Sequence, residues 1–192
     1  MNEINYNDEM DIFLSKPENY KSALELIDNI VRIDKKLADE FWLEVTQRLK
    51  SKIKKLMEIE VITKYDQDSN SDWFEIYKKD WDFYFISTDN EDVGIRIIDK
   101  PEKDMVVFKA IIEATIEEKK EQLGSFKSLK WPCWKTFSNY RFQTKQEKLK
   151  ILPDVRDTVI EGCVNTLFVY IGNLIEACEV LNKKINEIQN RE

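Results

Sequence analysis

Apolar and polar residues alternate with a period of two across residues 73–98, and this pattern predicts a short antiparallel sheet. Three segments carry the alternation, WFEIYK, WDFYFIS and VGIRII, and polar residues separate them at Lys79-Asp80 and at residues 88–92. Aromatic and β-branched residues, which favour strands, are enriched in all three. We therefore expect a three-stranded antiparallel meander.

On both sides of this sheet, apolar residues recur every three or four positions, which is typical of helices with one buried face. The spacing predicts an N-terminal helical pair at about residues 17–33 and 37–57, and a helix at about residues 102–122 that Gly124 ends. Residues 106–108 are also compatible with the start of a strand. Residues 125–150 are expected to be irregular or mixed, and a long C-terminal helix is expected at about residues 153–189.

These elements predict a single α+β domain. Residues 1–72 would form its helical N-terminal part, and residues 73–192 would form the sheet and the C-terminal helices. A chain of 192 residues is long enough for one domain with its own core. Its composition, 42% hydrophobic and 35% charged, is typical of globular proteins.

The N-terminus and the cysteines predict a cytoplasmic location. The first ten residues, MNEINYNDEM, are acidic and lack the apolar centre of a signal peptide. The longest apolar run, residues 167–171, is too short to span a membrane. Three cysteines is an odd number, which fits a reducing compartment better than a set of disulfides.

Charge is segregated along the chain, although the net charge is −7. Residues 66–104 contain twelve acidic and five basic residues, whereas residues 126–150 contain seven basic residues and one acidic residue. In the acidic region, the candidate partner-binding residues are Asp80, Asp82, Asp89, Glu91 and Asp92. Charges on a sheet edge also protect it from pairing with other strands, so a solvated edge is the alternative.

The basic segment interleaves cations with aromatic residues. Proteins that bind single-stranded nucleic acid use such aromatic residues to stack on bases and such cations to contact phosphates. The candidate nucleic-acid-binding residues are Lys130, Trp134, Lys135, Arg141 and Lys145. The alternative is that the aromatic side chains fill the core while the lysines point to solvent.

The sequence offers no familiar catalytic set, and we expect neither an enzyme nor a bound cofactor. Histidine is absent, which excludes Ser-His-Asp and Cys-His arrangements and the common zinc sites. Asp66-x-Asp68-x-Asn70-x-Asp72 resembles the start of a calcium loop, but its sixth residue is Ser71 and its twelfth is Tyr77, so a solvated loop without metal is favoured. Cys133, Cys163 and Cys178 are expected to be core residues.

From residue 73 onward, strands with DFYFIST and VGIRIID, a helix, the WPCWKTF motif and a closing helix follow one another. This order resembles the C-terminal accessory region of bacterial and phage PD-(D/E)XK nuclease-like proteins, over about residues 73–188. The nuclease half of that family needs an acid followed by acid-x-Lys on adjacent strands. Glu75-Ile76-Tyr77-Lys78 has one residue too many for this motif. The resemblance therefore implies an accessory region without the nuclease half, and no catalytic residue is carried over.

Together these features predict a non-catalytic protein-interaction module. One version is a phage or mobile-element inhibitor that directs its acidic residues at the basic groove of a host nucleic-acid-handling defence enzyme. The alternative is a nucleic-acid-binding accessory domain that uses residues 127–150. A homodimer through the long C-terminal helix is compatible with both.

Overall fold

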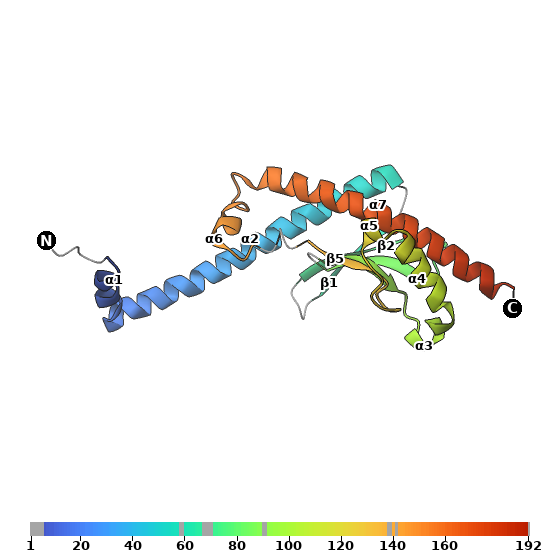
Figure 1. The fold of residues 1–192 in the computed structure, drawn as a ribbon. Coiled ribbons are helices and arrows are strands. Elements are labelled where there is room, and N and C mark those ends of the chain that lie inside the picture. Colours follow the sequence, from blue (N-terminus) through green and yellow to red (C-terminus); the bar gives the residue numbers. More distant parts are fainter. Residues whose placement is uncertain are drawn as a thin grey trace. The chain divides into compact units, whose positions relative to one another are not determined.

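The computed structural model describes residues 6–57, 60–66, 71–89, 92–137, 140 and 142–191 (Figure 1). It confirms the α+β class, with helices before and after an antiparallel sheet. The chain forms two compact units, Met1–Ala38 (unit 1) and Asp39–Glu192 (unit 2).

Unit 1 contains helix α1, Tyr6–Leu14, and the first part of helix α2, Pro17–Met57. Pro17 and Glu18 suit the first turn of α2, because proline has a fixed φ and an acid complements the helix dipole there. The predicted break between the helices at residues 17–33 and 37–57 is wrong, since α2 continues for 41 residues. Residues 34–36 are polar but include no glycine or proline, so nothing in the backbone stops the helix there.

Unit 2 contains a five-stranded antiparallel sheet with the strand order β1-β2-β3-β4-β5. The strands are β1 Glu60–Asp66, β2 Ser71–Tyr77, β3 Tyr84–Asp89, β4 Asp92–Ile97 and β5 Trp134–Thr136. Strands β2, β3 and β4 confirm the predicted meander, in which Ile76 lies opposite Ile86, and Ile86 lies opposite Ile95. Strands β1 and β5, which the sequence did not indicate, extend it at both edges.

The helix predicted at about residues 102–122 is present as four consecutive short segments. They are α3 Glu102–Met105, the 3-10 helix η1 Val106–Phe108, α4 Lys109–Glu118 and α5 Lys120–Leu123. Residues 106–108 are thus helical rather than the start of a strand. Gly124 has a φ of 84°, which glycine adopts without strain, and it ends α5 as predicted.

Helix α7, Arg156–Gln189, is the central element of the core of unit 2. It packs on β3 and β4, and α4 and α5 pack beside it (Figure 1). Asn182 joins α7 to the sheet: its Oδ1 accepts from the backbone N–H groups of Phe83 (2.7 Å) and Tyr84 (3.1 Å), and its Nδ2 donates to the carbonyls of Tyr84 and Cys178. Helix α6, Lys145–Leu149, begins with a capping box formed by Thr144 and Glu147.

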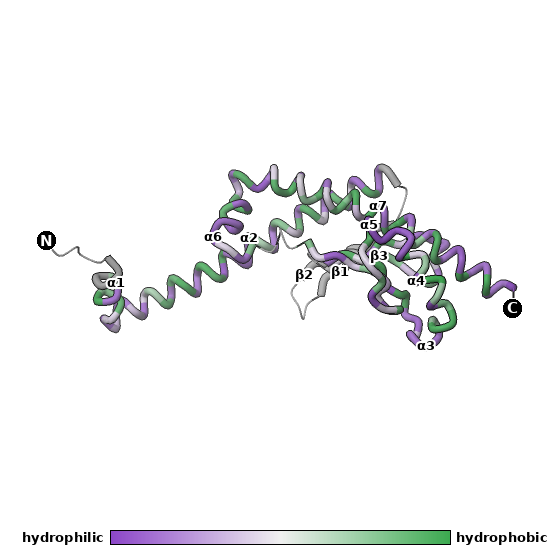
Figure 2. The backbone as a smooth tube through the Cα atoms, viewed as in Figure 1, coloured by the Kyte–Doolittle hydropathy of each residue, from purple (hydrophilic) through white to green (hydrophobic). Residues whose placement is uncertain are grey.

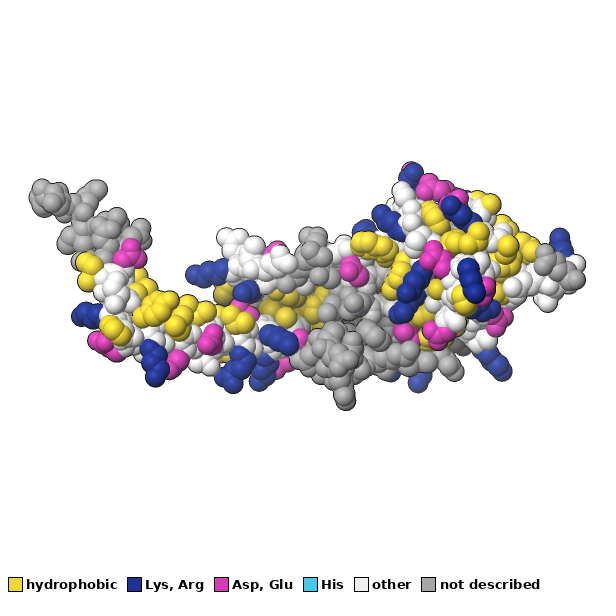
Figure 3. Space-filling model, turned by 90° about the horizontal axis from the view of Figure 1, so that it is seen from below, with side chains coloured by type: hydrophobic (Ala, Val, Ile, Leu, Met, Phe, Trp, Pro, Cys, Tyr) yellow, Lys and Arg dark blue, Asp and Glu magenta, His cyan; other side chains and the backbone are white. Residues whose placement is uncertain are grey.

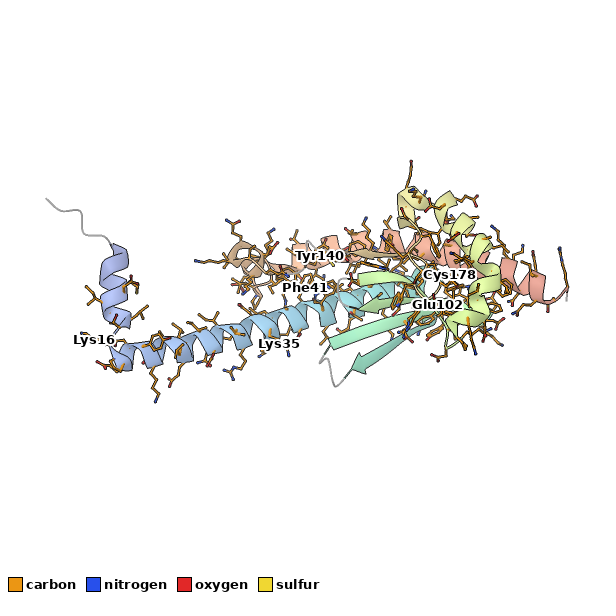
Figure 4. All side chains as sticks on the ribbon, turned by 60° about the horizontal axis from the view of Figure 1, so that its bottom comes forward. Lys16, Lys35, Phe41, Glu102, Tyr140 and Cys178 are labelled. Atoms are coloured by element: carbon orange, nitrogen blue, oxygen red, sulfur yellow. The ribbon has the colours of Figure 1, made fainter. Side chains whose placement is uncertain are left out.

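The second part of α2 supplies another layer of the same core. Phe41, Val45, Leu49 and Ile53 are 0–1% exposed. Phe41 packs edge-to-face on Phe142 and stacks on Tyr140 (Figure 4). The same part of α2 lies beside α7, since Arg48 bonds to Asp157 (2.6 Å) and Arg156 bonds to Glu40 (3.1 Å).

Among the described residues, α7 is long and apolar enough to cross a membrane, judged by length and composition alone. Its apolar stripe from Ile160 to Ile185 is buried in the core of unit 2. Val169 of the same helix is 66% exposed, and a homodimer through the C-terminal helix stays a prediction.

Candidate interaction sites

The predicted acidic residues are divided between the two ends of β3. Asp80 and Asp82 precede the strand, whereas Asp89 is its last residue and pairs with Asp92, the first residue of β4. At about 3.4 Å per residue, β3 separates the two groups by roughly 20 Å. The Asp82 carboxylate accepts from Asn186 of α7 (3.0 Å), and Asp92 accepts from the Thr136 hydroxyl. Glu91 and the side chain of Asp89 lie outside the described residues. The described acids thus do not form one patch.

The predicted basic residues are also divided. Trp134 and Lys135 are consecutive on β5, so their side chains point to opposite faces of the sheet. The Lys135 ammonium lies 5.7 Å from the rings of Phe137 and Tyr170, and Tyr170 belongs to α7. Lys145 is in α6, Lys130 is exposed before β5, and Arg141 lies outside the described residues. The structure therefore places Lys135 on the face opposite Trp134 and places Lys145 on a separate element, α6.

A pocket of about 300 Å³ lies beside Trp134 at the β4–β5 edge of the sheet. Two of its lining residues are tryptophans, Trp131 and Trp134, and Trp134 is 42% exposed. The Lys127 ammonium lies 5.7 Å from the Trp134 ring, and the Arg96 guanidinium lies 5.3 Å from the Trp131 ring. We call this pocket the tryptophan pocket. Its lining residues are Asp92, Val93, Lys127, Ser128, Trp131 and Trp134. It combines flat aromatic surfaces with nearby cations.

Backbone hydrogen bonds hold the loop that forms one wall of this pocket. Within the loop, the Lys127 N–H donates to the carbonyl of Pro132 (2.9 Å), and the Trp131 N–H donates to the hydroxyl of Ser128 (3.0 Å). The N–H groups of Ile95 and Ile97 in β4 donate to carbonyls of the loop at 3.0 and 3.1 Å. The pocket wall is therefore fixed to the central sheet.

Gly94 is required for the close approach of β4 to β5. A Cβ at this position would lie 2.4 Å from the Cys133 carbonyl oxygen and 2.5 Å from Trp134 Cβ. No side chain fits there without moving β5. The position of Trp134, and with it the pocket, depends on this glycine.

The sheet face that carries Trp134 also carries a polar and aromatic row. By register, Glu75, Ser87 and Gly94 lie across neighbouring strands on this face. Glu75 is only 3% exposed, and its Oε2 accepts from the Tyr77 hydroxyl (2.6 Å). Tyr77 stacks on Phe85 with ring centroids 4.7 Å apart. Burial and the bond to Glu75 raise the pKa of Tyr77 well above its usual range, so Tyr77 stays a hydrogen-bond donor.

The cysteines are core residues, as predicted. Cys133, Cys163 and Cys178 are fully buried. Burial raises the pKa of the Cys133 and Cys163 thiols to about 12, so both are protonated at neutral pH. Over the described part of the chain, no group of three or more Cys, Asp or Glu residues is placed to hold a metal ion. The candidate calcium loop includes positions 68 and 70, which lie outside that part.

Unit 1 presents a different kind of surface. In α2, seven large apolar side chains are 45–62% exposed, and we call them the unit 1 face: Tyr20, Leu24, Leu26, Ile27, Ile30, Val31 and Ile33. At 100° per residue they span about half of the helix circumference. Figure 2 shows hydrophobic residues recurring along this part of α2, and Figure 3 shows hydrophobic side chains uncovered along unit 1. Figure 4 draws the side chains of this part of α2 between the labelled Lys16 and Lys35.

Comparison of the chain with protein-family models, with curated proteins and with solved structures found no match.

Proposed function

We propose that this chain is a non-catalytic protein-interaction module that binds its partner through the unit 1 face. The supporting observation is the half-exposed state of seven large apolar side chains on one helix. Burial of apolar surface contributes roughly 25 cal/mol per Å², so leaving this face in water forgoes several kcal/mol. Exposed apolar patches of several hundred Å² commonly mark interaction sites.

The exposure of these side chains contrasts with the burial of apolar residues in the second part of the same helix. Phe41, Val45 and Leu49 on the same helix are almost completely inaccessible to water. An amphipathic helix gains most of its stability from the packing of its apolar face. A partner that covers the unit 1 face would supply this packing for residues 17–38.

The double variant Leu24→Lys/Ile27→Lys tests the proposal, since it places two charges at the centre of the unit 1 face. The matched control is Val169→Lys, because Val169 is 66% exposed on α7 in unit 2. We expect the wild-type chain and the control to bind a protein partner or a second copy of the chain, and the double variant to lose that binding. Affinity capture and light scattering measure the two cases. Binding that survives in the double variant would contradict the proposal.

The inhibitor of a host defence enzyme is another version of the interaction module, in which the partner contacts acidic residues of unit 2 instead of the unit 1 face. In that version the acidic residues Asp80 and Asp82 would face a basic groove of the enzyme and would mainly accelerate association. Reversing both charges would then slow association and weaken its dependence on salt, as stopped-flow mixing would show.

A second candidate function, binding of single-stranded nucleic acid, is favoured by the tryptophan pocket. Two indole rings offer stacking surfaces, and Lys127 and Arg96 lie beside them. Base stacking on an aromatic side chain contributes about 1–3 kcal/mol per base. Because Asp92 also lines the pocket, phosphate groups are expected beside Lys127 and Arg96 and away from its carboxylate.

Anisotropy of a labelled single-stranded oligonucleotide tests this second function. We expect Trp134→Ala to weaken binding at least roughly fivefold, and Lys127→Ala to weaken it and lower the salt dependence. Lys103→Ala, at an exposed position of α3, is the control. Equal binding by all three variants, or none at low salt, would exclude this function.

A further inference from the structure

We propose that the tryptophan pocket binds one guanine nucleotide, with the base stacked on an indole ring, its N–H edge on Asp92 and its phosphate beside Lys127 and Arg96. The inference rests on the second candidate function, whose site it uses, and it names the base that this site takes. It does not depend on the unit 1 face. Three observations support it: the size of the pocket, the order of charges along β4, and the acceptor capacity of one carboxylate.

The pocket has room for one base rather than for several. Its volume of about 300 Å³ is at the lower end of the roughly 300–1,000 Å³ that small-molecule sites occupy. Trp131 and Trp134 line it, and an indole ring offers a flat surface on which a planar base stacks. Of the described basic residues in the segment 126–150, only Lys127 lines the pocket, so it lacks the long cationic groove that follows a strand.

The order of charges along β4 matches the two ends of a nucleotide. Asp92, Gly94 and Arg96 are alternate residues of this strand, so they share the sheet face that carries Trp134. In the register, Trp134 lies opposite Gly94, between the two charged residues. At about 3.4 Å per residue, Asp92 and Arg96 are roughly 14 Å apart along the strand, and the reach of both side chains shortens this interval. A nucleotide has N–H donors at one end and a phosphate at the other, which is the same order.

The Asp92 carboxylate favours guanine over the other common bases. Its Oδ1 accepts from the Thr136 hydroxyl on β5, and a carboxylate can accept further hydrogen bonds at both oxygens. Guanine presents two adjacent N–H donors, at N1 and at its exocyclic amino group, and these match the two oxygens of a carboxylate. Adenine and cytosine present one amino group beside a ring nitrogen that is an acceptor, and uracil presents one N–H between two carbonyls. A carboxylate repels these acceptors.

The two cations beside the rings favour an anionic group at the other end of the ligand. The Lys127 ammonium lies 5.7 Å from the Trp134 ring, and the Arg96 guanidinium lies 5.3 Å from the Trp131 ring. Lys127 is exposed, and a cation–π contact at an exposed site is weaker than a charge-assisted hydrogen bond to phosphate. Its ammonium can therefore exchange the ring for a phosphate. The same cations disfavour a positively charged ligand on Asp92.

Isothermal titration calorimetry of the full chain with GMP, AMP and UMP tests the choice of base. We expect GMP to bind at least roughly fivefold more tightly than AMP or UMP, because a bidentate contact discriminates between bases by that factor or more. Asp92→Asn should remove this preference without weakening the binding of AMP, since stacking does not need the carboxylate. Asp104→Asn, at an exposed position of α3, is the matched control and should keep the preference.

Comparison of GMP with guanosine tests the phosphate contact. Lys127→Ala should weaken the binding of GMP at least roughly threefold more than that of guanosine, which has no phosphate. Trp134→Ala should weaken both ligands, since both stack. Lys103→Ala on α3 is the control and should change neither.

A free nucleotide and a guanine within a strand share this chemistry, and competition distinguishes them. A short oligo-deoxythymidine strand, with and without one central deoxyguanosine, is titrated against the chain loaded with GMP. Displacement of GMP by the guanine-containing strand alone would assign the base to a strand. Displacement by neither strand, with GMP bound, would assign it to a free nucleotide, and both results support the inference.

No binding of GMP at millimolar concentration, equal binding of the three nucleotides, or a preference for GMP that survives Asp92→Asn would each overturn the inference. If strands bind equally with and without guanine and Trp134→Ala releases them, the inference fails and the second candidate function stands. If neither nucleotides nor strands bind, both fail.

Discussion

Helix α2 carries the same apolar spacing in unit 1 and in unit 2, but the two parts differ in burial. Leu24 is 45% exposed, whereas Leu49 is 0% exposed. Both follow the three-and-four spacing of a helix with one face to bury. The spacing therefore shows that a face needs covering and does not show what covers it. In unit 2 the cover is the chain's own core, and in unit 1 we propose that it is another molecule.

The difference has an energetic consequence. A fully buried leucine contributes about 1.5–3 kcal/mol relative to an exposed one. In unit 2, burial of apolar side chains from α2, α7 and the sheet contributes this free energy within one chain. The face of unit 1 contributes in full only when a partner covers it, so residues 17–38 should be less stable than unit 2 in the isolated chain.

The matched substitutions Leu49→Ala and Leu24→Ala give the largest expected contrast. Leu49→Ala leaves a cavity in the core and should lower the free energy of unfolding by about 3–4 kcal/mol at any protein concentration. Leu24→Ala should cost less than about 1 kcal/mol, because Leu24 is 45% exposed. Urea unfolding at high dilution measures both variants. Equal losses for the two variants would show that unit 1 is covered within the chain.

The variant Asn182→Ala examines how firmly α7 holds the sheet inside unit 2. It would leave the buried N–H groups of Phe83 and Tyr84 without their acceptor, at a cost of about 3 kcal/mol. Asn186→Ala, which removes only an exposed bond to Asp82, should cost less than about 0.5 kcal/mol. A loss for Asn182→Ala no larger than for Asn186→Ala would show that the sheet does not depend on this contact.

Gly94→Ala should disturb the tryptophan pocket and leave the rest of unit 2 in place. The added Cβ displaces β5, and we expect a loss of about 2 kcal/mol together with a red shift of tryptophan fluorescence. Gly162→Ala is the control, since Gly162 is in α7 with open space around it and alanine should stabilise the helix by about 0.5–1 kcal/mol. An unchanged fluorescence spectrum in Gly94→Ala would contradict the described β4–β5 contact.

Alkaline pH should destabilise unit 2 through its buried thiols. Burial raises the pKa of Cys133 and Cys163 to about 12, whereas an exposed thiol has a pKa near 9. As pH rises, the unfolded chain releases these protons first, so the stability present below about pH 9 is lost progressively up to about pH 12. Burial also raises the pKa of the Tyr84 and Tyr170 hydroxyls, which adds to the loss. Urea unfolding across this range measures it, and stability that rises above pH 9 would contradict the burial.

The smallest effect is expected at the ion pairs between α2 and α7. Arg48 is partly exposed, and it bonds to Glu44 and to Asp157. Its bond to Glu44 is the main cause of its raised pKa. Arg48→Met should cost at most about 1 kcal/mol, and less at high salt, because exposed pairs are screened. A salt-independent loss of several kcal/mol would show that this pair contributes more than its exposure allows.

The sequence predicted the centre of the sheet because the alternation in β2, β3 and β4 is strong and local. It missed β5, since three residues beside Gly94 form a strand only through their partner in β4. The break proposed at residues 34–36 was wrong because three polar residues do not end a helix without glycine or proline.

The candidate sites were less accessible from sequence than the fold. Composition pointed to the aromatic and basic segment, and the structure groups Trp131, Trp134 and Lys127 from it. Arg96 was missed, although its alternate position in VGIRII placed it on the face opposite Ile95. The opposite directions of Trp134 and Lys135, and the separation of Asp82 from Asp92, follow from strand register. The exposure of the unit 1 face had no local signal, because its spacing equals that of the buried part of α2.

Hydrogen exchange of the α2 backbone amides in the isolated chain at high dilution tests the central claim most directly. We expect slow exchange in residues 41–53, whose apolar side chains are buried, and fast exchange in residues 20–33, whose apolar side chains are about half exposed. Equally slow exchange in both segments would contradict the claim.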